Sequence, residues 1–220
     1  MLFPNFVCVD NFFDNPEEVV NFSKKLEYFN ETTCPGKRSK ILHEVDYDFF
    51  NWVNLKICSV FYPNDISNIK FNADTYFQKI HKLEHDNWVH KDDTYRFTAI
   101  IYLNKNNTAG TSIFSAKNFK SSSYNASNIR YDYFKNENKK FSNEKINTIK
   151  KAKDINNERY NKTFSVEGIY NRLIIFDGNT YHASNPMNKD HERLTLISFI
   201  NDIDLQDKTI KYPIPTMRSV

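Results

Sequence analysis

The chain of 220 residues contains only 3 cysteines, Cys8, Cys34 and Cys58, and no C-x-x-C pair. This scarcity argues against a disulfide framework and a cysteine-rich zinc site, and it favours a reducing, cytoplasmic setting. Long apolar runs are also missing, since no stretch approaches the roughly 20 apolar residues that a membrane-spanning helix needs. The first residues carry no basic leader and soon reach Asp10 and Asp14. We therefore expect neither a signal peptide nor a membrane association.

A strong net charge is absent too, because 30 Lys and Arg face 27 Asp and Glu and leave +3 at pH 7. The charge is unevenly distributed, however: residues 115–163 hold 12 basic and 5 acidic residues, so that segment carries +7 and the remainder −4. Such a segment is typical of a solvated surface insertion, and it also suits contact with an anionic substrate or nucleic acid. We predict a single domain over residues 1–220 with a basic insertion at about 115–163.

Hydrophobic patterning divides the chain into a helical N-terminal part and a strand-rich remainder. Residues 5–9 predict a short strand, and Asp14 as cap with Pro16 in the first turn predicts a helix to about Tyr28. The clearest later strands are β-branched and aromatic, and they are apolar on both parities, as in a sandwich whose outer face is also covered. They cover residues 97–104, 171–176 and 193–201. The pattern predicts a mainly β, two-sheet barrel, with one more helix at about 142–160.

Two histidines and a carboxylate stand beside these strands. His90 and Asp92 form an H-x-D pair before one strand, and His182 follows another. Two imidazoles and one carboxylate are the facial ligand set of non-haem Fe(II) oxygenases, and they leave three coordination positions open. An H-x-D pair alone is weak, because such tripeptides arise by chance. Asp93 is an alternative ligand, although the H-x-D spacing favours Asp92.

Arg193 opens the strand at 193–201, where its side chain could turn into the barrel. A buried guanidinium needs an anion, and its fork fits a carboxylate such as the distal group of 2-oxoglutarate. A structural Asp or Glu is the alternative partner. Tyr102 shares strand parity with Thr98 and Ile100, so its hydroxyl could face the same cavity, unless the ring belongs to the core.

Taken in order, the segments H-x-D, IIYLN, AGT, NRLIIFDGNTYHAS and ERLTLISF resemble the 2-oxoglutarate/Fe(II)-dependent oxygenases, in particular their prolyl-4-hydroxylase-like branch. The resemblance implies a double-stranded β-helix, the jelly-roll or cupin-like fold, with N-terminal helices packed on one sheet. It implies that iron is held by His90, Asp92 and His182, and 2-oxoglutarate by Arg193, Tyr102 and, more weakly, Thr195. The chain departs from the family where Ala109-Gly110 replaces Gly-Gly and where the insertion lengthens the interval between the two histidines.

The activity implied by this resemblance is hydroxylation of a substrate C–H with O2, coupled to decarboxylation of 2-oxoglutarate to succinate and CO2. A peptidyl prolyl or other side chain ranks first as substrate, a small metabolite second and nucleic acid third. Two other classes stay open: a catalytically silent jelly-roll binding module, and a cupin-like metalloenzyme with another metal or no co-substrate. The insertion is either a lid or substrate-binding wall, or a helix that pads the barrel.

Two further features have competing interpretations. His81, His85 and His90 could form a rival metal site, but on a strand over residues 80–89 His90 would face away from the other two. The turn at residues 34–36, followed by Lys37 and Arg38, could face the substrate. We expect it to be an ordinary exposed turn.

Overall fold

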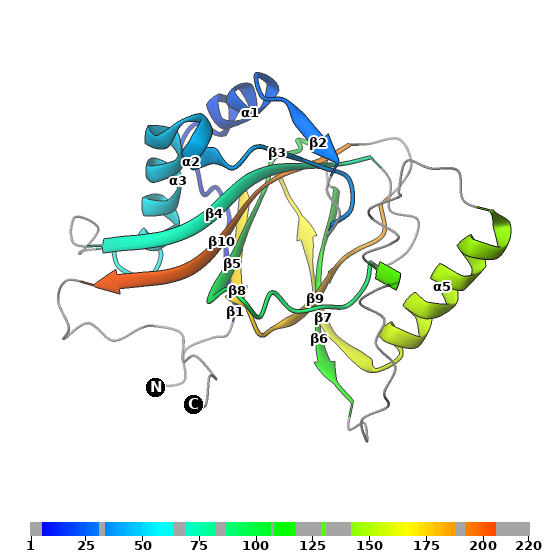
Figure 1. The fold of residues 1–220 in the computed structure, drawn as a ribbon. Coiled ribbons are helices and arrows are strands. Elements are labelled where there is room, and N and C mark those ends of the chain that lie inside the picture. Colours follow the sequence, from blue (N-terminus) through cyan, green and yellow to red (C-terminus); the bar gives the residue numbers. More distant parts are fainter. Residues whose placement is uncertain are drawn as a thin grey trace.

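The structure is a computed structural model that describes residues 6–30, 34–63, 69–81, 87–106, 108–117, 129–130, 142–187 and 192–205. Two antiparallel sheets form its centre (Figure 1). The larger sheet has the order β1-β8-β5-β10-β4-β3-β2, and the smaller has the order β7-β6-β9. The strands are β1 (Phe6–Val9), β2 (Tyr28–Asn30), β3 (Lys37–Ser39), β4 (Ile69–Ile80), β5 (Phe97–Tyr102), β6 (Thr108–Ala116), β7 (Tyr160–Gly168), β8 (Arg172–Asp177), β9 (Tyr181–Ser184) and β10 (Arg193–Leu205). This arrangement confirms the predicted jelly-roll.

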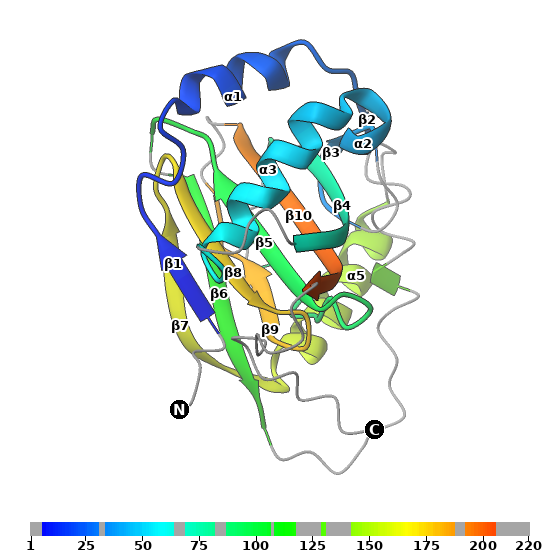
Figure 2. The same cartoon turned by 90° about the vertical axis from the view of Figure 1, so that its left-hand side faces the viewer.

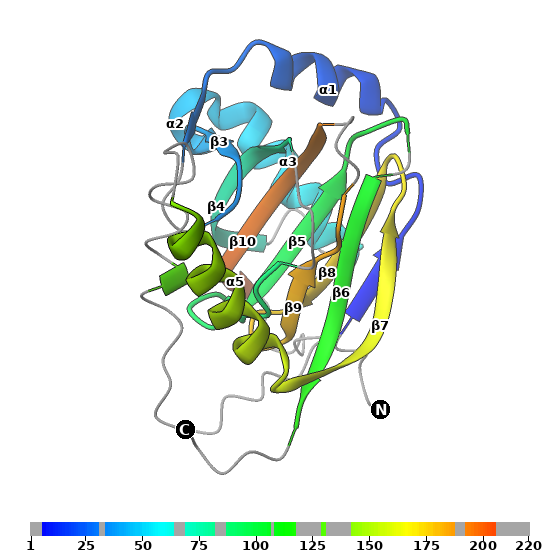
Figure 3. The same ribbon diagram turned by 90° about the vertical axis from the view of Figure 1, so that its right-hand side faces the viewer.

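Helices cover the outer face of the larger sheet, as expected. They are α1 (Pro16–Lys24), α2 (Leu42–Val45) and α3 (Tyr47–Ser59). Figure 2 shows α3 in front of this face and α1 across its upper end, and Figure 3 shows α5 (Asn143–Asn157) on the opposite side of the molecule. Within the part of the chain that the structure describes, no helix is long and apolar enough to cross a bilayer.

The first helix differs from the prediction at both ends. Its N-cap residue is Asn15, whereas the Asp14 carboxylate pairs with Lys56 Nζ at 3.0 Å, so Asp14 as cap was wrong. The helix ends at Lys24, before the predicted end at Tyr28. Tyr28 begins β2, because the backbone of residues 28–30 pairs with β3. Residues that helical periodicity alone would assign to α1 are thus in a strand, because they pair with β3.

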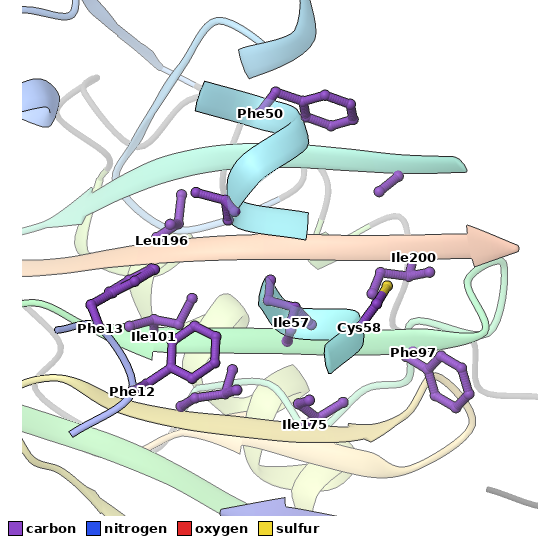
Figure 4. Close-up of a cluster of buried hydrophobic side chains, with 14 of the residues drawn as sticks. Phe12, Phe13, Phe50, Ile57, Cys58, Phe97, Ile101, Ile175, Leu196 and Ile200 are labelled. Carbon is purple, nitrogen blue, oxygen red and sulfur yellow. The ribbon is translucent and has the colours of Figure 1, made fainter. Parts of the chain in front are cut away.

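The main core lies between α1, α3 and the outer face of the larger sheet. Figure 4 shows Ile57 and Cys58 of α3 directed at the sheet, where Ile101, Ile175 and Leu196 project toward the helix. Residues of opposite parity on the same strands are also buried, since Ile100 and Ile197 belong to a second cluster on the inner face. Burial on both faces is the reason why these strands are apolar on both parities.

The basic segment lies between two paired strands, because Ala116 at the end of β6 is opposite Tyr160 at the start of β7. The helix expected at about 142–160 is α5, in which Ile149 is buried while Ile146 is 47% exposed. Polar contacts join its last turn to the segment before His90. Val89 N–H donates to Asn157 Oδ1 at 3.0 Å, and Asn157 Nδ2 donates to Asn87 O at 3.1 Å. The helix therefore contacts the backbone that leads into the candidate metal site.

Candidate metal centre

His90 and His182 are neighbours through their backbones. They form an isolated antiparallel bridge, in which His90 N–H donates to His182 O at 3.0 Å and His182 N–H donates to His90 O at 2.9 Å. The centroids of their rings lie 4.3 Å apart. Strand-like pairing thus brings together two side chains that are distant in the sequence, and it fixes the spacing of the rings.

Each ring is held in one tautomer. Nδ1 of His90 lies 2.8 Å from Trp88 O, and Nδ1 of His182 lies 3.0 Å from Thr180 O. A carbonyl oxygen only accepts, so each Nδ1 carries a hydrogen and each Nε2 is the nitrogen that faces a possible metal. Burial, assisted by the nearby charge of Arg130, holds the pKa of His90 well below its usual value. His90 is therefore a neutral imidazole at neutral pH, as a metal ligand must be.

Asp92 completes the cluster. Its Oδ1 lies 3.8 Å from His90 Nε2 and its Oδ2 lies 3.4 Å from His182 Nε2, and the three donor atoms are all within 4.8 Å of one another. The Thr98 hydroxyl donates to Asp92 Oδ2 at 2.8 Å, which orients the carboxylate. Two imidazole nitrogens and one carboxylate that converge in this way suit a divalent transition metal and leave one side of it open.

The loop after β8 supports this cluster through Gly178. Asp92 N–H donates to Gly178 O at 2.9 Å, and Gly178 N–H donates to Arg96 O at 3.0 Å. A Cβ on Gly178 would lie 2.0 Å from the carbonyl oxygen of Tyr95. Only glycine permits this close approach of the two backbones, so the residue fixes the loop that carries Asp92.

The cluster opens into a cavity of about 340 Å³. Strand register arranges its inner wall in rows: Thr98 is opposite Phe199 and Ile100 is opposite Ile197. Asp92 is bonded to Thr98, so the cluster lies at the first of these rows. The volume is at the low end of the range of small-molecule pockets, roughly 300–1,000 Å³.

Arg193 lines the same cavity from β10 and is only 2% exposed. Its Nε has no hydrogen-bond partner among the described residues, and its guanidinium carbon lies 5.3 Å from the centroid of the Tyr102 ring. Burial lowers the pKa of Arg193, and Tyr102 opposes this shift. No Asp or Glu within the described parts of the chain pairs with it, so the alternative of a structural carboxylate partner finds no support there.

Tyr102 and Thr195 are opposite each other in the register, beside Arg193. Both are fully buried, and neither lines the cavity directly. The Tyr102 hydroxyl donates to Thr111 Oγ1 at 2.8 Å, and Thr111 does line the cavity. Thr195 Oγ1 is buried without a hydrogen-bond partner in the described structure. These hydroxyls therefore lie near the Arg193 end of the cavity, in the layer of residues behind those that line it.

The turn at residues 34–36 contradicts the expectation of an exposed turn. Cys34 and Pro35 are buried and line the cavity, and Gln78 Nε2 donates to Pro35 O at 2.8 Å. Gly36 has φ of 75°, and a Cβ there would lie 2.1 Å from the Lys79 carbonyl oxygen. The glycine allows the turn to lie directly against β4, which is why the turn is enclosed.

Other candidates are placed differently. His81 is exposed, and its Nε2 lies 3.3 Å from Glu192 Oε2, whereas His85 falls outside the described residues. Asp93 lines the cavity but is not part of the cluster of donor atoms. Arg130, from the basic segment, also lines the cavity. Sequence reasoning missed it because nothing in the local pattern distinguishes it from the other basic residues of that segment.

Comparisons with known proteins agree with this fold. A family model, described as the family of unknown function DUF6445, matches residues 4–200. No curated protein matches the chain. An oxidoreductase of the 2OG-Fe(II) oxygenase family from Burkholderia pseudomallei aligns with a TM-score of 0.53 at 11% identity, over 90% of this chain and 85% of its own.

Two further solved structures are similar. HygX from Streptomyces hygroscopicus, with nickel and 2-oxoglutarate bound, has a TM-score of 0.52 at 10% identity over 92% of this chain and 84% of its own. A prolyl hydroxylase from Trichoplax adhaerens, in complex with a peptide fragment of the hypoxia inducible factor oxygen degradation domain, has a TM-score of 0.51 at 15% identity, over 90% and 84%. At these identities the similarity shows the shared fold alone.

Proposed function

The chain belongs to the DUF6445 family, and we propose that it is a non-haem Fe(II)- and 2-oxoglutarate-dependent oxygenase that hydroxylates a C–H bond of its substrate. One observation carries the proposal: the buried guanidinium of Arg193 faces the cavity that also contains His90, Asp92 and His182. A cluster of ligands alone would suit many metalloproteins. A buried cation in the same small cavity calls for an anionic co-substrate that reaches the metal.

In this proposal each residue of the site has a distinct role. His90, Asp92 and His182 would hold Fe(II) on one side, and Thr98 keeps the carboxylate oriented through its 2.8 Å hydrogen bond. When bound, iron and 2-oxoglutarate supply the oxidising chemistry, in which O2 is reduced while 2-oxoglutarate is converted to succinate and CO2 and one oxygen atom enters the substrate C–H bond.

Arg193 would pair with the distal carboxylate of 2-oxoglutarate at the inner end of the cavity. Tyr102 and Thr195 would support that end, Tyr102 by covering the guanidinium with its ring and both by placing hydroxyls near it. Ile100 and Ile197, which line the wall between the two ends, exclude water from the reacting groups.

Turnover of 2-oxoglutarate tests the proposal. Purified protein supplied with Fe(II) should form succinate slowly even without its substrate, and His90→Ala or Asp92→Ala should abolish this formation. His43→Ala is a matched control, because His43 is an exposed histidine on α2, on the outer side of the sheet. A wild-type protein that binds neither Fe(II) nor 2-oxoglutarate would contradict the proposal.

Arg193→Met separates this function from its alternatives. Charge-assisted hydrogen bonds of this kind contribute about 1.5–3 kcal/mol, so the variant should bind 2-oxoglutarate at least about tenfold more weakly while keeping its metal affinity. A silent binding module would bind both ligands without forming succinate. A cupin-like enzyme without this co-substrate would bind metal and show no effect of the substitution on 2-oxoglutarate.

The substrate is proposed at the level of class. Peptidyl prolyl or another side chain ranks first, ahead of a small metabolite, and the Trichoplax adhaerens structure offers an example in which a protein of this fold holds a peptide. A screen of peptides and small molecules by succinate formation, followed by mass spectrometry for the gain of one oxygen atom, distinguishes the two.

A further inference from the structure

A second arginine reaches the cavity from the enclosed turn. Arg38 follows Gly36 at the start of β3, and its guanidinium carbon lies 5.3 Å from the centroid of the Tyr76 ring and 5.1 Å from that of Phe199. Its side chain lines the cavity. Its Nε is buried without a hydrogen-bond partner, and no carboxylate of the described residues forms an ion pair with it. Within the described residues, Arg38 is thus a partly buried cation that no carboxylate pairs with directly.

The guanidinium groups of Arg38 and Arg193 contact different parts of the cavity wall. The backbone of Arg38 pairs with Gln78, in the row of Thr195, but its guanidinium lies against Phe199, whereas that of Arg193 lies near Tyr102. Phe199 is opposite Thr98, and Thr98 binds Asp92. Arg38 is therefore near the metal cluster, whereas Arg193 is at the inner end. One small dicarboxylate held by Arg193 and the metal would leave the guanidinium of Arg38 available.

Arg130 adds positive charge at this end. It lines the same cavity as Arg38. Arg130 comes from the basic segment between β6 and β7, so two separate parts of the chain supply cations to one region. Bound divalent metal would offset the charge of Asp92 and make this region still more positive.

We propose that Arg38, with Arg130 nearby, forms a second anion subsite, which receives a carboxylate or phosphate group of the substrate itself. The assignment of this anion to a substrate rests on the proposed oxygenase function. The rings of Tyr76 and Phe199 hold the guanidinium in place, and its N–H groups provide the fork that binds a planar or tetrahedral oxyanion. Gly36 allows the turn that presents it.

Anion titration of metal-free protein tests the subsite without requiring iron, 2-oxoglutarate or turnover. The starting protein is Arg193→Met, which removes the inner cation, and the probes are inorganic phosphate and acetate in separate calorimetric titrations. At least one probe should bind at millimolar concentration, and the stronger one indicates whether the subsite prefers phosphate or carboxylate. Adding Arg38→Met should weaken that binding about tenfold or more.

Lys37→Met in the same background is the matched control, because Lys37 is the preceding residue, carries the same charge and does not line the cavity. It should leave anion binding unchanged. Arg38→Lys, which keeps the charge but loses the fork, should bind more weakly than Arg38 and guards against a folding defect in Arg38→Met. The proposal is overturned if neither probe binds at millimolar concentration, or if Arg38→Met and Arg38→Lys bind as well as the parent. Failure of the oxygenase function would appear separately, as wild-type protein that forms no succinate.

Discussion

The two faces of the larger sheet differ in how some of their buried polar groups are paired. On the outer face Asn54, Thr75 and Ser198 hydrogen-bond to one another, and Asn54 Nδ2 also donates to Phe50 O at 2.8 Å. On the inner face Arg193 Nε and Thr195 Oγ1 have no partner among the described residues. Buried polar groups that serve folding are satisfied within the protein. On the inner face these two groups are thus left for the proposed co-substrate.

The largest expected effect compares adjacent residues of β5 that face opposite ways. Ile101→Ala should lower the free energy of unfolding by about 2–5 kcal/mol, because it leaves a cavity in the dry core under the helices. Ile100→Ala should lower the free energy of unfolding by a smaller amount, since Ile100 already borders the cavity. Urea denaturation of both metal-free variants measures the difference. An equal or larger loss for Ile100→Ala would show that the inner face contributes as much to folding as the outer face.

A smaller effect is expected for Thr98→Val, which keeps the shape of the side chain and removes the hydrogen bond to Asp92 Oδ2. Loss of a group that orients a metal ligand typically lowers metal affinity about tenfold to a hundredfold. Thr75→Val, on the outer face, is the control and should lower stability by about 1–3 kcal/mol without changing Fe(II) affinity. Competition with a chromophoric chelator measures the affinities. Equal Fe(II) binding by the two variants would contradict the division between faces.

The smallest effect tests whether the helix of the basic segment supports the metal site. Asn157→Ala removes the bonds to Val89 N–H and Asn87 O, so His90 should be held less firmly and Fe(II) affinity should fall by less than about tenfold. Asn147→Ala changes an exposed residue of the same helix and should have no effect. If both variants bind Fe(II) like wild type, α5 covers the barrel without positioning the ligand.

Local patterns were sufficient for the strands of the central sheet. Successive residues of β5 and β10 point to opposite faces of the sheet, and both faces are buried. Both sets of residues are therefore mostly apolar, and the resulting apolar runs predict these strands. The inward direction of Arg193 and the shared parity of Thr98 and Tyr102 also followed from strand geometry. The ligand roles of these residues stay predictions that binding measurements must test.

Other features depend on contacts that no local pattern contains. Residues 28–30 form a strand only because β3 is available to pair with them. Arg38 turns inward because Gly36 allows the turn to approach β4. A glycine in a turn predicts an unusual φ angle, but it does not predict which strand the turn will pack against. The hydrogen bond between Val89 N–H and Asn157 Oδ1 joins segments far apart in the sequence, so it depends on the fold.

The position of β10 in the larger sheet has a consequence for synthesis of the protein. This strand is the last of the described strands along the chain, yet it lies between β5 and β4. Until it emerges from the ribosome, β5 and β4 have no common partner, and their apolar edges are exposed to other chains. The cation proposed for co-substrate binding is the first residue of this strand. A nascent chain should therefore acquire its fold and its binding site in one late step, and premature termination before residue 193 should yield aggregation instead of a smaller folded product.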